Sequence, residues 1–246
     1  MTDAVILAGG LGTRLRPAVS DVPKPLAPVN GRPFLDHQLA WLARGGVTRA
    51  IITAHHLADQ IIRFAKDRNG FPIPIEVVRE QYPLGTGGAV KNATEVAKVR
   101  GTAVVVNGDT YYRFNLAGLA AAHDQGNAPV TMAVARIDDC ARYSTVEVCA
   151  GRVTRFTQAA GDRTPGMVNC GIYIMEAAAM ADAPEGAFSM EYDFFPSAAG
   201  AGRLGAHIVK AETGNENAND GGKIPAFLDF GTPESYAAIN QELGKR

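Results

Sequence analysis

A glycine-rich turn directly after the first apolar run is the segment of this sequence best suited to bind phosphate. Residues 4–8 (Ala-Val-Ile-Leu-Ala) have strand character, and residues 9–12 (Gly-Gly-Leu-Gly) follow them without a break. Glycine lets the backbone approach an anion closely, so that several N–H groups can converge on it. Arg14 adds a planar fork of donors that matches phosphate oxygens, and Lys24 adds a compact positive charge. This combination predicts a phosphate-binding turn.

Two well-known glycine motifs do not fit this turn. A Walker loop requires Lys followed by Ser or Thr directly after its last glycine, and this pair does not follow Gly12. A dinucleotide-binding fingerprint requires a third glycine at the position of Leu15 and a helix that begins at once. The segment instead contains residues that interrupt helices: Pro17, Pro23, Pro25 and Pro28. The glycines are therefore expected to lead into a long loop, although a plain bend with a solvated Arg14 and Lys24 stays an alternative.

The elements that must position this turn follow an alternating pattern in the first half of the chain. Apolar, β-rich runs cover residues 4–8, 50–54, 73–79 and 102–107, and amphipathic segments cover residues 34–44, 57–67 and 87–97. Another helix is expected over residues 116–125, with Asn115 as its N-cap. The alternation predicts an α/β protein with a mostly parallel central sheet and helices on both faces.

The second half of the chain has a different pattern. Strand-like runs separated by short turns cover residues 130–137, 145–148, 153–156 and 168–175. They predict antiparallel additions to the central sheet. Residues 213–222 are rich in Asn and Gly and indicate an exposed loop, and a final helix is expected over residues 233–243. Since no linker or repeat divides the sequence, one domain over residues 1–246 is predicted.

Composition and charge exclude several classes of protein. A formal net charge of −1 over 246 residues provides no strongly basic surface, so we expect no nucleic-acid partner. No apolar run approaches membrane-spanning length, and no signal peptide precedes the first strand, so we expect a cytoplasmic protein with no membrane partner. The cysteines lack metal-type spacing and are interpreted as reduced core thiols: Cys140, Cys149 and Cys170.

Two aspartates end apolar runs that are far apart in the sequence. Asp109 closes the run over residues 104–109, and Asp229 closes the run over residues 226–229. Ligands of open α/β sheets bind beyond the carboxyl ends of the strands, where both side chains are expected. The alternative is that each aspartate merely begins a turn, as Asp after a strand commonly does.

Several motifs together resemble one enzyme family. Residues 9–15 (Gly-Gly-Leu-Gly-Thr-Arg-Leu), followed by residues 24–26 (Lys-Pro-Leu), are similar to the signature of the sugar-1-phosphate nucleotidyltransferases. The likeness covers nearly the whole chain, since it continues through residues 84–89, 107–109, 169–173 and 228–233. It implies a Rossmann-like nucleotidyltransferase fold and the transfer of a nucleotidyl group from a nucleoside triphosphate to a sugar 1-phosphate.

The resemblance also implies roles for individual residues. The attacking group is a phosphate oxygen, so the protein must supply alignment and positive charge. Mg²⁺ is the implied cofactor, with Asp109 and Asp229 as its ligands. Arg14 is expected to bind the β- and γ-phosphates and Lys24 to lie between the α-phosphate and the sugar phosphate, so Arg14, Lys24 and Asp109 are the expected catalytic residues. The expected nucleotide contacts are Leu7, Gly9, Gly10, Gly12, Thr13, Glu80, Gly85 and Thr86.

Glu80 is the residue that points to a particular base. Family members that bind uracil or thymine have Gln four residues before the leucine of the motif, and this sequence has Glu80 four residues before Leu84. A carboxylate can accept from the two adjacent donors of guanine, whereas it would be repelled by the O4 atom of uracil. This difference favours GTP, with Gln81 as an additional contact. The alternative is an exposed glutamate at the end of a strand.

The expected sugar site is less complete. The resemblance implies that Asn169 contacts a sugar hydroxyl, that Gly171 leaves space, and that Glu191 faces sugar hydroxyls, although Glu191 also suits a helix N-terminus. Many relatives carry a Phe-x-Glu-Lys motif whose lysine binds the sugar phosphate, but residues 156–160 here are Phe-Thr-Gln-Ala-Ala. Arg163 or Lys223 could replace that lysine, or the acceptor phosphate is held less tightly.

The combined prediction is a magnesium-dependent guanylyltransferase acting on GTP and a sugar 1-phosphate. Within the family the chain most resembles the bacterial D-glycero-α-D-manno-heptose 1-phosphate guanylyltransferases, which supply GDP-heptose for capsule or surface-layer polysaccharide. Mannose 1-phosphate as acceptor and a uridylyltransferase are alternatives within the enzyme class. A regulatory nucleotide-sugar-binding protein without turnover is the alternative outside it. Because relatives commonly self-associate through an apolar surface, a homo-oligomer stays open.

Overall fold

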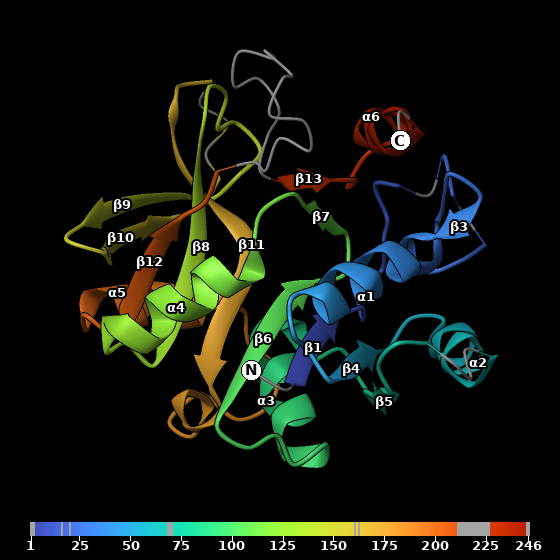
Figure 1. Cartoon of the computed structure of the whole chain (residues 1–246), viewed down its shortest axis with the longest axis horizontal. Helices are drawn as coiled ribbons and strands as arrows, with labels where there is room; N and C mark the ends of the chain where they lie inside the picture. The colour runs from blue at the N-terminus through green and yellow to red at the C-terminus, as the bar shows by residue number, and fades with distance from the viewer. Residues whose placement is uncertain are drawn as a thin grey trace.

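A nine-stranded sheet runs through the centre of the protein (Figure 1). The computed structural model describes residues 3–15, 17–19, 21–67, 71–159, 161, 163–210 and 227–244. Along the sheet the strands follow the order β5-β4-β1-β6-β11-β8-β12-β10-β9. Their bounds are β1 (Asp3–Leu7), β4 (Arg49–Ala54), β5 (Ile75–Arg79), β6 (Thr102–Asn107), β8 (Val130–Ile137), β9 (Thr145–Cys149), β10 (Arg152–Thr157), β11 (Gly166–Glu176) and β12 (Leu204–Ile208).

The strands β5, β4, β1 and β6 form a parallel half-sheet that is covered on both faces. Successive residues of a strand point to opposite faces, so Ala4 and Ile6 belong to one apolar core and Val5 to the other. The first core is covered by α1 (Phe34–Arg44), α2 (Ala58–Asp67) and α4 (Leu116–Gly126), and the second by α3 (Gly85–Val96) and α5 (Phe195–Gly200). The prediction of helices on both faces is confirmed.

The other half of the sheet is mixed. Strand β11 is antiparallel to both of its neighbours, β6 and β8, whereas β12 is parallel to β8, and β10 and β9 complete the sheet as an antiparallel pair. The prediction of a mostly parallel sheet is therefore wrong for this half. Its physical reason is the connection between β8 and β11, which is the β9–β10 hairpin rather than a crossover helix, so that β11 returns antiparallel. The antiparallel additions that the sequence predicts are confirmed.

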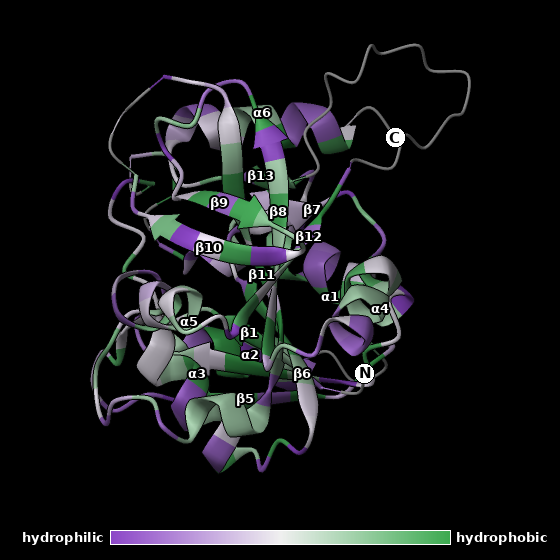
Figure 2. Ribbon diagram, turned by 90° about the vertical axis from the view of Figure 1, so that its left-hand side faces the viewer, coloured by the Kyte–Doolittle hydropathy of each residue, from purple (hydrophilic) through white to green (hydrophobic). Residues whose placement is uncertain are grey.

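The β9–β10 hairpin has one exposed face. Ala150 and Gly151 connect its strands with φ values of +46° and +73°, as a two-residue hairpin turn requires. Figure 2 shows hydrophilic and hydrophobic residues alternating along β10, where Val153 and Phe156 are buried and Arg155 is exposed. This hairpin therefore adds to the edge of the sheet without extending both cores.

A third apolar cluster joins the C-terminal helix to the loop that follows the glycine turn. Its buried members are Leu15, Ala27, Val29, Phe34, Tyr111, Phe230, Ile239 and Leu243. Most of them belong to or lie next to α6 (Pro233–Gly244), α1 and two small antiparallel strand pairs. One pair is β2 (Pro28–Val29) with β3 (Arg32–Pro33), and the other is β7 (Thr110–Tyr112) with β13 (Phe227–Asp229). In Figure 1, α6 lies beside β13 at the same side of the sheet. Segments at the two ends of the chain are thus held together near the glycine turn.

Most elements fall where the sequence predicts them. The helix over residues 34–44 and the strands over residues 102–107 and 130–137 coincide with α1, β6 and β8. Asn115 caps α4 as predicted, because its side chain accepts a hydrogen bond of 2.9 Å from Ala117 N. Strand β12 and a π-helical turn at Met190–Phe194 are not predicted, and the expected loop over residues 213–222 lies outside the described residues.

Two further expectations concern the cysteines and the membrane. All three cysteines are free thiols, but Cys149 is exposed, so the interpretation as core thiols is correct only for Cys140 and Cys170. In the described part of the chain, no helix combines the length and the apolar character that crossing a bilayer requires.

Candidate active site

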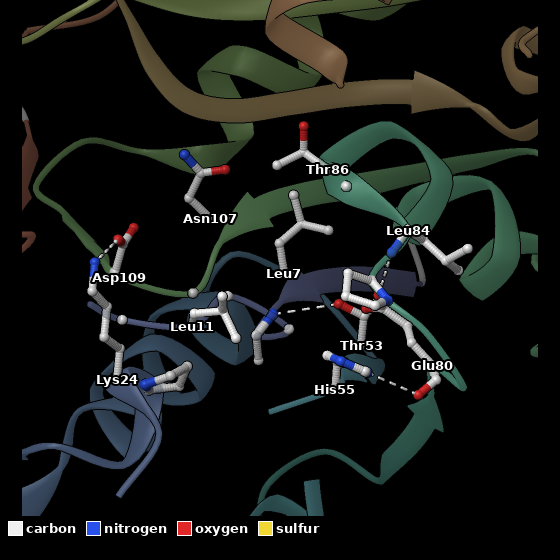
Figure 3. Close-up of a pocket in the computed structure, with 18 residues that line it drawn as sticks. Leu7, Leu11, Lys24, Thr53, His55, Glu80, Leu84, Thr86, Asn107 and Asp109 are labelled. Carbon is white, nitrogen blue, oxygen red and sulfur yellow. Dashed lines mark hydrogen bonds and ion pairs between the residues drawn. The ribbon is translucent and has the colours of Figure 1, made fainter. Parts of the chain in front are cut away.

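A cleft of about 340 Å³ lies at the carboxyl ends of the four parallel strands. Shortly after these ends, β1 leads to Gly9, β4 to His55, β5 to Glu80 and β6 to Asp109, and all four residues line the cleft. This placement follows the general rule for open α/β sheets. Of the predicted site residues, those that line the cleft are Leu7, Gly9, Gly10, Gly12, Lys24, Glu80, Gly85, Thr86 and Asp109. Figure 3 shows Lys24 and Asp109 at one end of the cleft and Glu80 and His55 at the other.

The glycine turn presents backbone donors to the cleft. The N–H groups of residues 9–12 donate no hydrogen bond to any other described residue. Gly12 has a φ of +62°, and a Cβ atom there would lie 3.3 Å from Lys24 Cγ, so both conformation and space favour glycine. Thr13 and Arg14 are exposed and do not line the cleft. Of the predicted signature, the structure therefore places the free amides of residues 9–12 at the cavity, but not Thr13 and Arg14.

Lys24 and Asp109 form an ion pair in the cleft. Lys24 Nζ lies 3.0 Å from Asp109 Oδ2, with side chains that are 16% and 32% exposed. Lys24 begins a short 3₁₀ helix, Lys24–Leu26, between Pro23 and Pro25. Because Pro23 and Pro25 restrict the backbone on both sides of Lys24, the lysine side chain projects from a stiff loop. The pair leaves both charged groups accessible to a ligand.

Gln38 holds the turn that carries Asp109, and sequence reasoning missed it. From α1, its amide nitrogen donates to Asn107 O at 2.6 Å and to Thr110 O at 2.9 Å. Gln38 is buried, at 1% exposure. Nothing in the sequence marks this residue, because it is one polar position within an amphipathic helix.

Glu80 lies beneath the glycine turn at the other end of the cleft. It is 5% exposed, and Oε2 accepts a hydrogen bond of 3.2 Å from Leu84 N. Oε1 is buried without a hydrogen-bond partner among the described residues, and a Cβ atom on Gly9 would lie only 2.7 Å from it. Burial raises the pKa of Glu80, while the hydrogen bond from Leu84 and the neighbouring His55 and Thr53 oppose the shift. The alternative of an exposed glutamate at a strand end is wrong.

His55 lines the cleft beside Glu80 and was also missed. Its Nδ1 lies 3.2 Å from the carbonyl oxygen of Glu80, so the tautomer with the proton on Nδ1 donates there. Its position directly after β4 was the available signal, since the same reasoning identifies Asp109 after β6.

The glycines of residues 84–89 make room for a distant segment. A Cβ atom on Gly87 would lie 2.1 Å from the ring of Phe188, and one on Gly88 would lie 2.3 Å from Gly186 O. The N–H groups of Gly87 and Gly88 both donate to Phe188 O, at 2.9 Å and 3.3 Å. Gly85, which lines the cleft, has a φ of +68°. These glycines therefore dock the segment around Phe188 against the first turn of α3.

Thr86 connects this docked segment to the cleft. Its hydroxyl donates to Glu191 Oε2 at 2.7 Å and accepts from Met190 N at 2.8 Å. Ser189 caps the π-helical turn by accepting from Glu191 N, so the alternative of Glu191 as an acid at a helix N-terminus is confirmed. Glu191 does not line the cleft itself. The structure thus links a predicted nucleotide contact to a predicted sugar contact through one hydroxyl group.

Asn169 and Gly171 lie in an irregular part of β11. The register of β11 with β8 shifts between Asn169 and Tyr173, and Gly171 has a φ of +71°. Asn169 Oδ1 accepts from Gly171 N at 2.9 Å, and Asn169 Nδ2 donates to Tyr173 OH at 2.8 Å. A Cβ atom on Gly171 would lie 2.5 Å from Asn107 Nδ2. The Asn169 amide therefore shapes this bulge, and Gly171 gives space to Asn107, which lines the cleft.

The backbone segments that carry Asp229 and Asp109 lie side by side in space, although Asp229 does not line the cleft. Asp229 pairs with Thr110 in the β13–β7 ladder, and Phe230 N donates to Asp109 O at 3.1 Å. The convergence of the two aspartate-bearing segments, which are far apart in sequence, is therefore observed. Arg14 lies at the same place, because a Cβ atom on Gly231 would be 3.4 Å from Asp229 Oδ2 and 3.6 Å from Arg14 Nη2.

Both carboxylate oxygens of Asp229 have protein partners. Tyr143 OH donates to Oδ1 at 2.6 Å, and Arg142 Nη2 donates to Oδ2 at 2.6 Å. Burial and the charge of Asp229 raise the pKa of Tyr143 above its ordinary value, so its hydroxyl remains a donor to Asp229 even at alkaline pH. Sequence reasoning missed both partners, which lie in a loop without an expected element.

The two aspartates fit the ligand set that Mg²⁺ prefers. Among the described residues, no group of three or more His, Cys, Asp and Glu side chains could hold a metal ion. Mg²⁺ that arrives with substrate phosphates needs only one or two carboxylates, so Asp109 and Asp229 suffice in kind and number. Their oxygens accept hydrogen bonds from Lys24, Arg142 and Tyr143, and since an ionised carboxylate has about four acceptor positions, positions are left for a cation.

The candidates for the missing sugar-phosphate lysine are not brought to the cleft. Arg163 is exposed and does not line it. Lys223 lies outside the described residues. Gln158, in the stretch that lacks the lysine, donates from Nε2 to Glu191 O at 3.3 Å. This stretch therefore supports the segment of Glu191 and supplies no cation.

Comparison with known proteins gives consistent matches over the whole chain. The profile of the family described as Nucleotidyl transferase matches residues 3–246. D-glycero-alpha-D-manno-heptose 1-phosphate guanylyltransferase from Aneurinibacillus thermoaerophilus is 31% identical over 243 residues, which are 98% of each chain. Mannose-1-phosphate guanylyltransferase from Mycobacterium tuberculosis is 34% identical over 98% of this chain, which spans 64% of that protein. The crystal structure of HddC from Yersinia pseudotuberculosis complexed with GMP-PN superposes with a TM-score of 0.81 at 32% identity, covering 99% of this chain and 100% of that one.

Proposed function

The chain belongs to the nucleotidyl transferase family, and from that premise we propose that it transfers a guanylyl group from GTP to a sugar 1-phosphate. A phosphate oxygen of the acceptor attacks the α-phosphorus of GTP. The bond from that phosphorus to the bridging oxygen of the β-phosphate breaks, and pyrophosphate leaves with the electron pair. The products are a GDP-sugar and pyrophosphate, and residues 1–246 act as one catalytic domain.

The observation that carries the choice of base is Glu80. Its Oε1 is a buried acceptor with no donor among the described residues, which is an unfavourable arrangement unless a ligand supplies one. Guanine offers two adjacent donors, N1–H and the exocyclic amine, and Glu80 lines the cleft at the end opposite to Lys24 and Asp109. Relatives named as guanylyltransferases and the HddC complex with GMP-PN support the same base.

The opposite end of the cleft suits the reacting phosphates. The free amides of residues 9–12 would bind the triphosphate, and Lys24 would offset the repulsion between the α-phosphate and the acceptor phosphate. Arg14 lies outside the cleft beside Gly231, so its proposed contact with the β- and γ-phosphates needs a triphosphate that extends beyond the glycine turn. When bound, Mg²⁺ would supply further positive charge at the triphosphate, with Asp109 and Asp229 as its proposed ligands.

The proposed acceptor is D-glycero-α-D-manno-heptose 1-phosphate, and the product would serve the synthesis of surface polysaccharide. The heptose-specific relative matches this chain over 98% of both lengths, whereas the mannose-specific relative is longer and is spanned to 64%. Mannose 1-phosphate shares the ring stereochemistry and is the nearest competing acceptor. Asn169, Gly171 and Glu191 remain the proposed sugar-side residues.

A two-dimensional screen tests this proposal. The purified protein is incubated with Mg²⁺, with GTP, UTP, dTTP, CTP or ATP, and with a panel of sugar 1-phosphates, and pyrophosphate release is measured for each pair. The proposal expects turnover with GTP and the heptose 1-phosphate, with mannose 1-phosphate slower. Preference for UTP would make the protein a uridylyltransferase, and tight GDP-sugar binding without pyrophosphate release would make it a regulatory binding protein.

A further inference from the structure

We propose that Arg142, in the loop between β8 and β9, binds the phosphate of the acceptor sugar. This inference rests on the proposed function, because it concerns the second substrate of the same site. It identifies a cation for a subsite that the stretch over residues 156–160 leaves without one.

Arg142 lies against the segment that approaches Asp109. Its Nη2 donates to Asp229 Oδ2 at 2.6 Å, and its guanidinium carbon lies 5.8 Å from the centroid of the Tyr143 ring. The side chain of Asp229 is 21% exposed, while that of Arg142 is 45% exposed. One edge of the guanidinium is thus fixed to a carboxylate while the rest of the group is accessible.

The loop is fastened to both strands that border the proposed acceptor site. The ring of Tyr143 packs edge-on against Phe227 of β13, with centroids 5.4 Å apart. On the other side, Asn169 N of β11 donates to Ser144 O at 3.1 Å. Arg142 is therefore held between the strand that carries Asp229 and the strand that carries Asn169, where the phosphate of a sugar contacting Asn169 would have to reach the GTP site.

The guanidinium keeps donors for a second anion. An arginine side chain has five N–H donors, and hydrogen bonds from Arg142 to described residues involve Nη2 alone. A guanidinium that keeps one carboxylate contact can still bind phosphate oxygens with its remaining donors, in the forked geometry that suits them. The ion pair with Asp229 thus orients the group before the substrate arrives.

Other described cations fit this role less well. Lys24 pairs with Asp109 at 3.0 Å, and the proposed function already assigns it to the repulsion between the two phosphates. Arg163 is exposed, and no ion pair with a described residue orients it toward Asp109 or Asp229. Arg14 approaches Gly231 from the glycine turn and so from the nucleotide side. Arg142 approaches the same aspartate from the loop on the acceptor side.

Kinetics of Arg142→Met and Arg142→Lys test the inference. For Arg142→Met, the KM for the sugar 1-phosphate should rise roughly tenfold to a hundredfold, which is the size expected for a lost charge-assisted hydrogen bond. The KM for GTP should change by less than about threefold. Arg142→Lys should recover part of this loss, because it keeps the charge without the fork. Calorimetric titration of the sugar 1-phosphate into each variant gives a second readout that does not depend on turnover.

Arg155→Met is the matched control. Arg155 also pairs with a carboxylate, Glu147, at 3.5 Å, but both lie exposed on the β9–β10 hairpin away from the cleft. Its kinetic constants should stay at the wild-type values.

Two outcomes would overturn the inference in distinguishable ways. If Arg142→Met lowers kcat and changes the Mg²⁺ dependence but leaves the KM and affinity for the sugar 1-phosphate unchanged, Arg142 only orients Asp229. If the wild type itself releases no pyrophosphate with any substrate pair, the proposed function fails and the acceptor role of Arg142 fails with it.

Discussion

The parallel and mixed halves of the sheet build their parts of the site by different means. In the parallel half, site residues follow strand ends: Gly9 after β1, Glu80 after β5 and Asp109 after β6. In the mixed half, the predicted sugar residues depend on irregular features, which are a bulge at Gly171 and a π-helical turn at Glu191. The proposed nucleotide side is therefore a product of the general topology, whereas the proposed acceptor side depends on local irregularities of the backbone.

The two halves share the β6–β11 ladder, and at the site further polar contacts connect segments that lie far apart in the sequence. These contacts are the places where the comparison can be tested. Thr86 links the first turn of α3 to Glu191, and Phe230 N links β13 to Asp109 O. If the halves act as separate binding surfaces, substitutions on one side should change one substrate's constants and leave the other's nearly unchanged.

The largest effect is expected at Asp109, which follows β6, the strand of the parallel half that pairs with β11 of the mixed half. Asp109→Asn should lower kcat by roughly a hundredfold to a thousandfold, because it removes a proposed metal ligand and the partner of Lys24. Thermal unfolding should stay near that of the wild type, since Asp109 is partly exposed. Pyrophosphate release with GTP and a sugar 1-phosphate is the measurement.

Asp59→Asn is the control for this substitution. Asp59 also forms an ion pair, with Arg79 at 2.8 Å, but its side chain is 71% exposed on α2. Wild-type turnover in Asp109→Asn would remove this residue from the reaction centre.

The next effect separates the bases and concerns the nucleotide half alone. Glu80→Gln should lower kcat/KM for GTP relative to UTP by roughly tenfold to a hundredfold, because an amide no longer accepts from two donors of guanine. The KM for the sugar 1-phosphate should change little. Steady-state kinetics with each triphosphate measure the ratio, and Glu147→Gln on the exposed hairpin serves as the matched variant. Unchanged preference for GTP would mean that another residue reads the base.

A smaller effect is expected at the hydroxyl that joins the halves. Thr86→Val should raise the KM for the sugar 1-phosphate about tenfold, because Glu191 loses a hydrogen bond of 2.7 Å that orients it. The KM for GTP should rise less, and Thr86→Ser should restore both constants. An equal loss for both substrates would show that Thr86 supports the whole cleft and that the halves are not separable there.

The smallest effect is on stability and follows from the raised pKa of Glu80. Burial raises the pKa of Glu80 in the folded protein, so folding favours its protonated form. The free energy of unfolding therefore falls as the pH rises from the unfolded pKa of about 4.3 through the folded pKa. Wild type should therefore lose stability relative to Glu80→Gln as the pH rises above about 4.3, and the two should be closest in stability below that pH. Urea unfolding across this range measures the difference. A difference that is constant with pH would show that ionisation of Glu80 carries no cost.

The parallel half is predicted well from the sequence, because each of its strands is marked by its own apolar run and one topological rule places the residues that follow the strands. Apolar β-rich runs define β1 and β6, and the topology places whatever follows them at one edge, so the positions of Gly9 and Asp109 follow from spacing, whereas the role of Asp109 comes from the resemblance. His55 obeys the same rule and could have been found, since it follows a predicted strand directly. The base contact at Glu80 needed the resemblance in addition, and its burial beneath Gly9 needed the structure.

The remaining parts depend on contacts between residues that are far apart in sequence. Gln38 holds the Asp109 turn by donating to two carbonyl groups about seventy positions away in the sequence. The helical pattern around Gln38 does not indicate these partners. Arg142 is an ordinary loop arginine until β13 brings Asp229 to it. The antiparallel return of β11 likewise depends on which connection the chain uses, and a strand pattern does not specify that.

A crystal structure with a non-hydrolysable GTP analogue and Mg²⁺ tests the central claim most directly. The account predicts the triphosphate on the amides of residues 9–12, the guanine edge on the Glu80 carboxylate, and Asp109 and Asp229 as ligands of the metal. A nucleotide bound away from the glycine turn, or a base that leaves Glu80 without contact, would contradict it.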